Sequence, residues 1–262
     1  MRMILPLLPM SNSLPHDHII PFKESSKTKK QQVAEMFDGI AGRYDFMNRF
    51  LSARTDLGWR RKAIKWLKSD DPKTLLDIAT GTADMAIMAC KLLKPNRIEG
   101  IDISREMLEI GKKKIEKENL NNIVHLQLGD SETINFAENT FDAGMVAFGV
   151  RNFENLEKGL AEILRVLKPG GQLVILEFSR PKQPFRSVYN FYMGWLAPQF
   201  ARWFSQNKNA YQYLCESANA FPDRNKLTDI LNKVGFSSTR YKSLSLGICC
   251  IYSGRKPVPQ NT

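Results

Sequence analysis

The sequence predicts an α/β fold built around a doubly wound, mostly parallel β-sheet. From Leu75 onward, short apolar runs alternate with segments of helical periodicity, a pattern typical of parallel strands joined by crossover helices. Two helical segments precede the first strand, and residues 237–257 contain two apolar runs around a turn. This last pair predicts an antiparallel finish to the sheet.

The individual elements are predicted from periodicity and from the residues that end each segment. A first helix is expected to begin near Thr28, and a second to cover residues 57–69 before "DDPK". Strands are predicted at residues 75–79, 97–103, 123–130, 141–148 and 171–178. Later helices are predicted at residues 83–93, 105–119, 156–171 and 223–236, the third ended by "PGG" and the fourth by Gly235.

The domain organisation follows from length and composition. The chain has 262 residues, of which 43% are hydrophobic, enough for one full-sized core. Residues 1–25 are expected to form a disordered leader, because prolines interrupt its apolar run and no small-residue cleavage site follows. Residues 26–257 are expected to form a single domain with an insertion at about 181–215, followed by a tail at 258–262. No apolar run is long enough to span a bilayer.

Charge and cysteine usage narrow the class of protein. Lysine and arginine outnumber the acids by 38 to 27, which gives a net charge of +11. This excess favours an anionic partner, whether nucleic acid, an acidic membrane surface or a negatively charged substrate. The cysteines show no metal-binding or secretory spacing, which indicates a reducing compartment and no metal site; they are Cys90, Cys215, Cys249 and Cys250.

Acidic residues lie at the carboxyl ends of the first three predicted strands. The first strand is expected to end at Asp77 and to turn at Gly81, where a ligand can approach the backbone closely. Asp102 ends the second strand, where a carboxylate can accept both hydroxyls of a ribose. Asp130 and Ser131 end the third strand, where they can receive an adenine amino group.

These acids predict a site for a mononucleoside. A dinucleotide site is disfavoured, because "ATGTAD" has one glycine where a pyrophosphate loop needs G-x-G-x-x-G. Taken singly, each acid could equally be a helix cap or a solvated loop residue. As an ordered set they resemble the S-adenosylmethionine site of class I methyltransferases. That resemblance implies a seven-stranded sheet with an antiparallel last strand, and a first loop that holds the methionine end of the cofactor.

A closer resemblance covers roughly residues 31–256. The segments "VAEMFDGIAGRYDFMNRFLS", "LLDIATGTAD", "GIDIS", "AFGVRNF", "EILRVLKPGG" and "AYQYLCESANAFPD" are similar, in this order, to the signatures of the ubiquinone/menaquinone-biosynthesis C-methyltransferases. The resemblance implies S-adenosylmethionine as cofactor. It places cofactor-binding positions at Thr82, Asp102, Asp130 and Ser131, and Gly81 joins them as the point where the backbone can approach the cofactor closely. Ala147 stands where the family often has serine.

The reaction implied by this resemblance is methylation of a ring carbon on a prenylated hydroquinone. The conversion of demethylmenaquinol to menaquinol is favoured, because "TGTAD" is closer to menaquinone-only relatives. Methylation of the benzoquinol precursor of ubiquinone, or of both rings, remains the alternative. Arg151 is expected to stabilise a ring phenolate, Asn152 to orient the ring hydroxyl or a water, and Tyr44 to cover the substrate or the methyl donor. The alternatives are a structural salt bridge for Arg151 and simple lid packing for Tyr44.

The predicted insertion is rich in aromatic and basic residues. Residues 180–209 contain eight aromatic residues, five lysines or arginines and no acid, with Tyr189, Tyr192 and Trp195 at helical spacing. This stripe is either core or an apolar cover that admits a polyprenyl tail. Its flanking cations are Arg186, Arg202 and Lys208. These cations suggest a cytoplasmic enzyme that binds the inner face of the membrane transiently. The sequence is also compatible with a homodimer.

Three other classes of function fit the sequence less well. A nucleic-acid methyltransferase would explain the charge, but the chain lacks an NPPY-like motif, a Pro-Cys nucleophile motif and an appended recognition domain. A non-catalytic cofactor-binding module would explain the unusual glycine loop, but not the retained Arg151-Asn152 pair. A methyltransferase acting on a sterol or phospholipid would keep the cofactor half, yet "AYQYL" resembles the quinone family.

Overall fold

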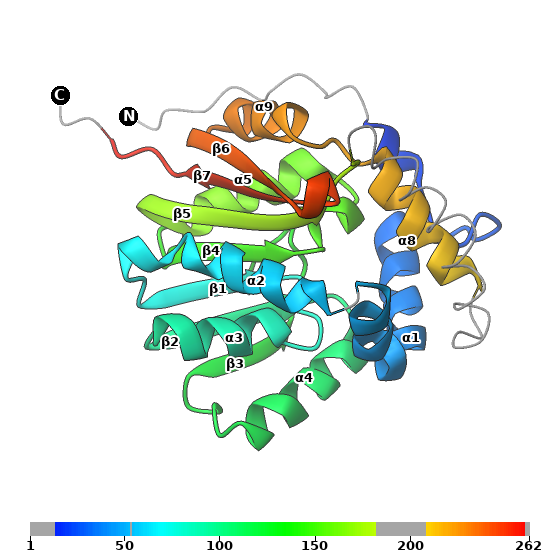
Figure 1. Ribbon diagram of the computed structural model, residues 1–262, viewed down its shortest axis with the longest axis horizontal. Helices are drawn as coiled ribbons and strands as arrows, with labels where there is room; N and C mark the ends of the chain where they lie inside the picture. The colour runs from blue at the N-terminus through cyan, green and yellow to red at the C-terminus, as the bar shows by residue number, and fades with distance from the viewer. Residues whose placement is uncertain (1–13, 53, 182–207, 260–262) are drawn as a thin grey trace.

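The computed structural model describes residues 14–52, 54–181 and 208–259, and at its centre is a seven-stranded sheet (Figure 1). The strands are β1 Thr74–Ile78, β2 Arg97–Asp102, β3 Val124–Leu128, β4 Phe141–Ala147, β5 Leu167–Phe178, β6 Ser237–Leu244 and β7 Cys249–Arg255. Their order is β3-β2-β1-β4-β5-β7-β6. The first five strands pair in parallel, and β7 runs antiparallel to both β5 and β6. The predicted doubly wound sheet with an antiparallel finish is therefore confirmed.

Helices cover both faces of this sheet and the carboxyl edge of its parallel strands. Those in the described ranges are α1 Lys29–Leu51, α2 Thr55–Lys65, α3 Asp84–Leu93, α4 Arg105–Lys117, α5 Leu156–Val166, α8 Lys208–Ala220 and α9 Asn225–Val234. Successive strand residues point to opposite faces. Leu75 and Met145 accordingly belong to the core with α2 and α3, whereas Leu76 and Val146 belong to the core with α5 and α9.

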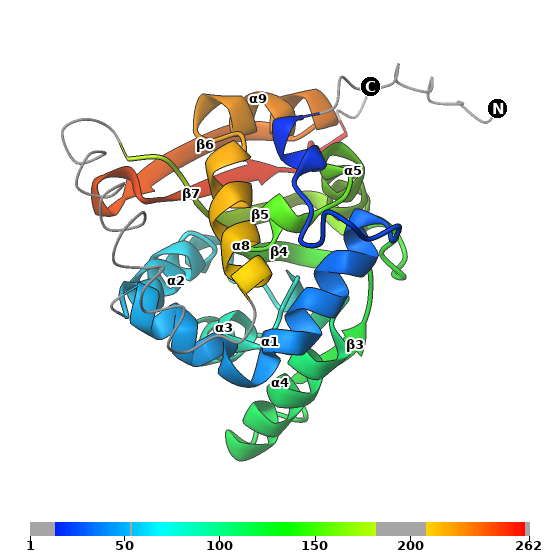
Figure 2. The ribbon, with the colours of Figure 1, turned by 90° about the vertical axis from the view of Figure 1, so that its right-hand side faces the viewer.

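A third apolar cluster joins α1, α4 and α8 at the carboxyl edge of the parallel strands. Figure 2 shows α1 and α8 lying across that edge, in front of the sheet. Val33 and Met36 of α1 pack here with Met107 of α4 and Tyr213 of α8. Two helices, α1 and α8, thus cover the edge at which ligands bind in open α/β sheets.

The N-terminal segment from Leu14 packs on the domain, which corrects the expectation of a disordered leader reaching residue 25. His16 is fully buried in the short helix Pro15–His18, with its ring edge-on to Phe221 at 5.0 Å. Burial, together with the charge of Lys29, lowers the pKa of His16 to about 3, so the ring is neutral at physiological pH. Lys29 Nζ donates to the backbone oxygen of His16 at 2.8 Å, which attaches this segment to α1.

Some boundaries differ from the predicted ones. β1 ends at Ile78, so Asp77 lies inside the strand. α5 ends at Val166, before the Pro-Gly-Gly sequence, because the backbones of Gly170 and Gly171 pair with Lys256 in extended structure. α9 ends as predicted at Gly235, whose φ of 114° suits a residue without a side chain.

The predicted aromatic stripe, formed by Tyr189, Tyr192 and Trp195, lies outside the described residues, as do the cations Arg186 and Arg202. Of the insertion, α8 is described and is helical as expected. Within the described ranges, no helix combines the length and the apolar character needed to cross a bilayer.

Candidate active site

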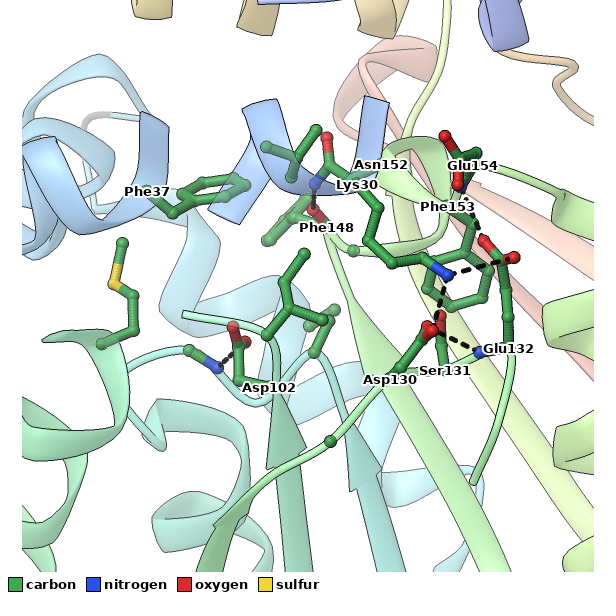
Figure 3. A pocket seen from close by; sticks show the side chains of 18 of the residues that line it. Lys30, Phe37, Asp102, Asp130, Ser131, Glu132, Phe148, Asn152, Phe153 and Glu154 are labelled. Carbon is green, nitrogen blue, oxygen red and sulfur yellow. Dashed lines mark hydrogen bonds and ion pairs between the residues drawn. The ribbon is translucent and has the colours of Figure 1, made fainter. Parts of the chain in front are cut away.

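A pocket opens at the carboxyl ends of β1, β2 and β4, beneath α1, and Figure 3 shows the side chains that line it. Its volume is about 650 Å³, including space open to solvent. α1 contributes Lys30, Val33, Phe37 and Tyr44. The strand ends and their loops contribute Ala79, Gly81, Asp102, Ile103, Gly129, Asp130, Ser131, Glu132, Ala147, Phe148, Gly149, Asn152, Phe153 and Glu154, and α4 contributes Met107.

The loop after β1 has an alternating left-handed backbone. Ala79, Gly81 and Ala83 have φ angles of 52°, 56° and 64°. A side chain in this region costs roughly 1 to 3 kcal/mol, so the two alanines hold strained positions that glycine would occupy freely. A Cβ added at Gly81 would meet nothing within 4 Å, which leaves its backbone open to a ligand. The small-residue alternation Ala-x-Gly-x-Ala was the sequence signal for this shape, and the single-glycine interpretation missed it.

Ala79 also explains a glycine on the neighbouring loop. A Cβ added at Gly149 would lie 2.5 Å from the Cβ of Ala79, closer than real Cβ atoms approach. Gly149, in "FGVRNF", must therefore be glycine, because any side chain there would clash with the methyl group of Ala79.

Asp102 forms a polar cup at the end of β2. Its Oδ2 accepts a hydrogen bond from the backbone N–H of Gly81 at 2.8 Å, and its Oδ1 accepts one from Ser104 at 2.9 Å. Burial raises the pKa of Asp102 to about 6. Each carboxylate oxygen has two lone pairs, so acceptor capacity remains for two ribose hydroxyls. With the open backbone at Gly81, this arrangement fits a nucleoside cofactor.

A cluster of charges forms the other end of the pocket (Figure 3). Lys30 Nζ lies 2.5 Å from Asp130 Oδ2 and 3.4 Å from Glu132 Oε2. Asp130 Oδ1 accepts from the backbone N–H of Glu132 at 2.9 Å, and Ser131 lines the pocket beside it. Asp130 and Ser131 are thus brought to the predicted end of the site. Lys30 was missed, because nothing in the sequence indicates a partner 100 residues away.

Thr82, predicted to be nearest the methionine end, does not line the pocket. It is buried, and its hydroxyl donates to Asp45 Oδ1 at 2.7 Å and accepts from Lys114 Nζ at 2.9 Å. The side chain therefore fastens the first loop to α1 and α4. In this geometry the Thr82 hydroxyl does not reach the pocket, so the expected cofactor contact is corrected to a role in supporting the loop.

Asp77 is likewise not part of the rim. It is 1% exposed, and its Oδ2 accepts a hydrogen bond from Thr80 Oγ1 at 2.6 Å. Burial raises its pKa to about 7. Because it lies inside β1, its side chain supports the loop from below, and two of the three predicted acids, Asp102 and Asp130, line the pocket.

Arg151 forms a buried ion pair, and its guanidinium does not line the pocket. Its NH1 donates to Glu177 Oε1 and to the backbone oxygen of Phe148, both at 2.7 Å. Arg151 is 2% exposed and Glu177 is fully buried. Of the two alternatives, this geometry is that of the structural salt bridge, and direct contact with a ring hydroxyl is corrected.

The ion pair supports a strained turn at the end of β4. Phe148 lines the pocket with a φ of 60°, a conformation costly for a bulky residue. The Phe148 ring stacks on the Phe178 ring, with centroids 4.6 Å apart, and Cζ of Arg60 lies 5.2 Å from the Phe148 centroid. The turn is thereby held so that Asn152, in the short helix Val150–Asn152, reaches the pocket.

Asn152 and Tyr44 are the predicted catalytic residues that do line the pocket. The ring of Tyr44 packs edge-on against Phe37, with centroids 5.7 Å apart. Asn152 Oδ1 accepts a hydrogen bond from the hydroxyl of Tyr213 at 3.1 Å. Tyr213 lies in the "AYQYL" segment, where the family resemblance gave no sign of its role at the pocket. In the part of the chain that the structure describes, no group of three His, Cys, Asp or Glu side chains is placed to hold a metal ion.

The sheet order, together with the Asp102 carboxylate and the open Gly81 backbone that fit a nucleoside, is that of the class I methyltransferases, which depend on S-adenosylmethionine. A solved S-adenosylmethionine-dependent methyltransferase from Aquifex aeolicus has a similar fold, with a TM-score of 0.50 at 19% identity over 70% of this chain and 82% of that one.

Sequence comparison then gives the family. The model of the ubiE/COQ5 methyltransferase family matches residues 25–256. A demethylmenaquinone methyltransferase of Bacteroides fragilis is 42% identical over 243 residues, which cover 92% of this chain and 99% of that relative. A ubiquinone/menaquinone biosynthesis C-methyltransferase of Geotalea daltonii is 42% identical over 87% of this chain and 97% of its own length. The chain belongs to the ubiE/COQ5 methyltransferase family.

The Asp102 cup predicts a pH-dependent affinity for S-adenosylmethionine. Because ribose hydroxyls donate to the ionised carboxylate, affinity should be highest above about pH 7 and should fall as the pH drops through 6. Asp102→Asn leaves one acceptor oxygen in place of two and should weaken binding by about 10- to 100-fold with little pH dependence. Calorimetric titration between pH 5 and 7.5 measures both effects. Glu109→Gln, which removes an exposed acid on α4, is the control, and a flat profile in the parent would contradict the assignment.

The Arg151–Glu177 pair predicts a large effect on stability. Arg151→Met leaves the fully buried Glu177 carboxylate without its cation, which should lower the free energy of unfolding by about 3 to 5 kcal/mol. Adding Glu177→Gln removes the unpaired charge and should recover most of that loss. Urea unfolding of both variants measures this difference. An unchanged unfolding midpoint in Arg151→Met would show that the pair has no structural role.

Proposed function

We propose that this methyltransferase methylates a ring carbon of a prenylated hydroquinone, converting demethylmenaquinol to menaquinol. The observation that carries the proposal is that two family-specific segments contact each other at the pocket, near Asp102. Asn152 of "FGVRNF" lines the pocket and is hydrogen-bonded to Tyr213 of "AYQYL". The relative from Bacteroides fragilis, named demethylmenaquinone methyltransferase, supports the same acceptor.

The cofactor half of the site binds S-adenosylmethionine, which supplies a methyl group made electrophilic by the sulfonium. Asp102 accepts the ribose hydroxyls, and the open backbone at Gly81 lies beside it. Asp130 and Ser131 receive the adenine end, with Lys30 holding the Asp130 carboxylate in place. These residues align the donor, and alignment alone can contribute on the order of 7 to 11 kcal/mol to catalysis.

The acceptor half has an apolar wall and few polar groups. Phe37 and Phe148 line the pocket, and Tyr44 covers it from α1. A hydroquinol ring carbon becomes a good nucleophile when a ring hydroxyl passes its proton to solvent water, so the site must favour the phenolate. The amide N–H of Asn152 donates to that oxygen. Arg151 acts indirectly, because its guanidinium holds the Phe148 carbonyl and the turn that carries Asn152.

The benzoquinol precursor of ubiquinone is the second candidate acceptor. The relative from Geotalea daltonii carries both quinones in its name, and it has the same 42% identity to this chain as the relative from Bacteroides fragilis, over 230 residues instead of 243. Both rings present a phenolic oxygen next to the carbon to be methylated, so the Asn152 donor suits either.

The acceptor is tested by following label from radioactive S-adenosylmethionine into quinone. Purified protein in detergent is given reduced demethylmenaquinone or the reduced demethylated benzoquinone precursor. Label is expected in the naphthoquinone. Label in both acceptors would establish a shared enzyme, and Asp102→Asn serves as the cofactor-deficient control. If S-adenosylmethionine binds but neither acceptor is labelled, the proposed function is wrong.

The enzyme meets this lipid acceptor at a membrane surface, to which it binds reversibly. The support is the net charge of +11, since each basic residue near anionic lipid contributes about 1 kcal/mol. Co-sedimentation at low salt should show binding to anionic vesicles that contain phosphatidylglycerol. Binding should be lost at high salt and with neutral vesicles. Failure to bind the anionic vesicles at low salt would contradict surface attachment.

A further inference from the structure

The contact between Tyr213 and Asn152 carries an inference about how the acceptor oxygen is bound. We propose that Tyr213 is a positioning residue, which fixes the amide of Asn152 so that an N–H and not the oxygen faces the ring oxygen of the acceptor. The inference rests on the proposed function and deepens it. Tyr213 works through Asn152 and does not itself line the pocket.

The orientation of the amide follows from its two partners. Asn152 Nδ2 lies 3.4 Å from the backbone oxygen of Phe148, and a carbonyl oxygen can only accept a hydrogen bond. The nitrogen must therefore be on that side, and the amide oxygen faces Tyr213. Since this oxygen accepts, the Tyr213 hydroxyl must be the donor in the 3.1 Å contact. Figure 3 shows the Asn152 amide and the dashed line between Asn152 and Phe148.

Tyr213 supplies the stronger of the two restraints. A separation of 3.4 Å is long for an N–H···O bond, and the Phe148 oxygen is already shared with Arg151 at 2.7 Å. Among residues 14–52, 54–181 and 208–259, Tyr213 is the one donor to the Asn152 amide oxygen. Without this hydroxyl, little would prevent the amide from turning its oxygen into the pocket, where it would repel a phenolate.

One amide hydrogen remains for the acceptor. The oxygen of Asn152 is occupied by Tyr213 and one N–H by Phe148, while the residue itself lines the pocket. The second N–H has no partner in the described part of the chain. A donor directed at a ring oxygen favours its ionised form. Polarisation of the amide by Tyr213 strengthens that donor further.

The surroundings of Tyr213 keep its hydroxyl in the donating form. The side chain is 1% exposed on α8, and burial raises its pKa well above the usual value. The Arg151 charge lowers that pKa, but by less than burial raises it. The tyrosine therefore stays protonated through the pH range in which the enzyme would be assayed.

The first test is Tyr213→Phe, which keeps the ring and removes the donor. We expect kcat with the quinol acceptor to fall about tenfold while the Kd for S-adenosylmethionine stays within about twofold. The limb on which kcat rises with pH should move to higher pH, because the acceptor hydroxyl ionises less readily without the oriented N–H. Tyr241→Phe, which removes a hydroxyl from β6, is the matched control and should keep the parent kcat and profile.

A double-mutant cycle separates positioning from a general loss of packing. If Tyr213 acts through the amide, Tyr213→Phe should cost less than about twofold in kcat when Asn152 is already alanine. An equal loss in both backgrounds, or an unshifted pH profile in the single variant, would overturn the inference. Cofactor binding and thermal melting confirm that each variant is folded. If the parent enzyme labels neither quinol, the proposed function fails; if it labels one and Tyr213→Phe behaves like the parent, the positioning role fails alone.

Discussion

The pocket depends on the polar contacts that hold α1 across the carboxyl ends of the parallel strands (Figure 2). Parallel strands end in loops that need a cover from elsewhere in the chain, and α1 provides it. Side chains along the helix reach the loops after β1, β2 and β3. The contacts are Lys30 with Asp130, Asp38 with Ser104, Asp45 with Thr82, and Arg49 with Asp84. One helix thus sets the positions of three loops relative to one another.

The buried ion pair beneath the pocket positions neighbouring groups more than it stabilises the fold. Arg151 and Glu177 are both removed from water, and such a pair gains little over an apolar pair of similar size. Its effect is local, because Arg151 also holds the carbonyl of Phe148 in a strained turn. This strained turn brings Asn152 to the pocket. The unfavourable free energy of the buried pair and of the strained backbone is therefore concentrated beside the proposed acceptor site.

The residues of the proposed active site come from three distant segments, and each segment provides one part of that site. "RYDFMN" in α1 contributes the cover and the Asp45 contact to the first loop. "FGVRNF" contributes the strained turn and the Asn152 amide, and "AYQYL" contributes Tyr213, which orients that amide. The chemistry of the acceptor site therefore depends on contacts between segments more than 60 residues apart.

The sequence by itself determined the sheet, its helices and the positions of Asp102 and Asp130. Hydrophobic periodicity and Gly235 are local signals, and the carboxyl ends of parallel strands always share one edge, so acids that follow those strands must gather there. Only the tertiary structure decided that Thr82 and Arg151 face away from the pocket and that Tyr213 faces Asn152. The reason is physical: a polar side chain points toward whichever partner satisfies it when buried, and those partners, Asp45, Glu177 and Asn152, lie 26 to 61 residues away along the chain.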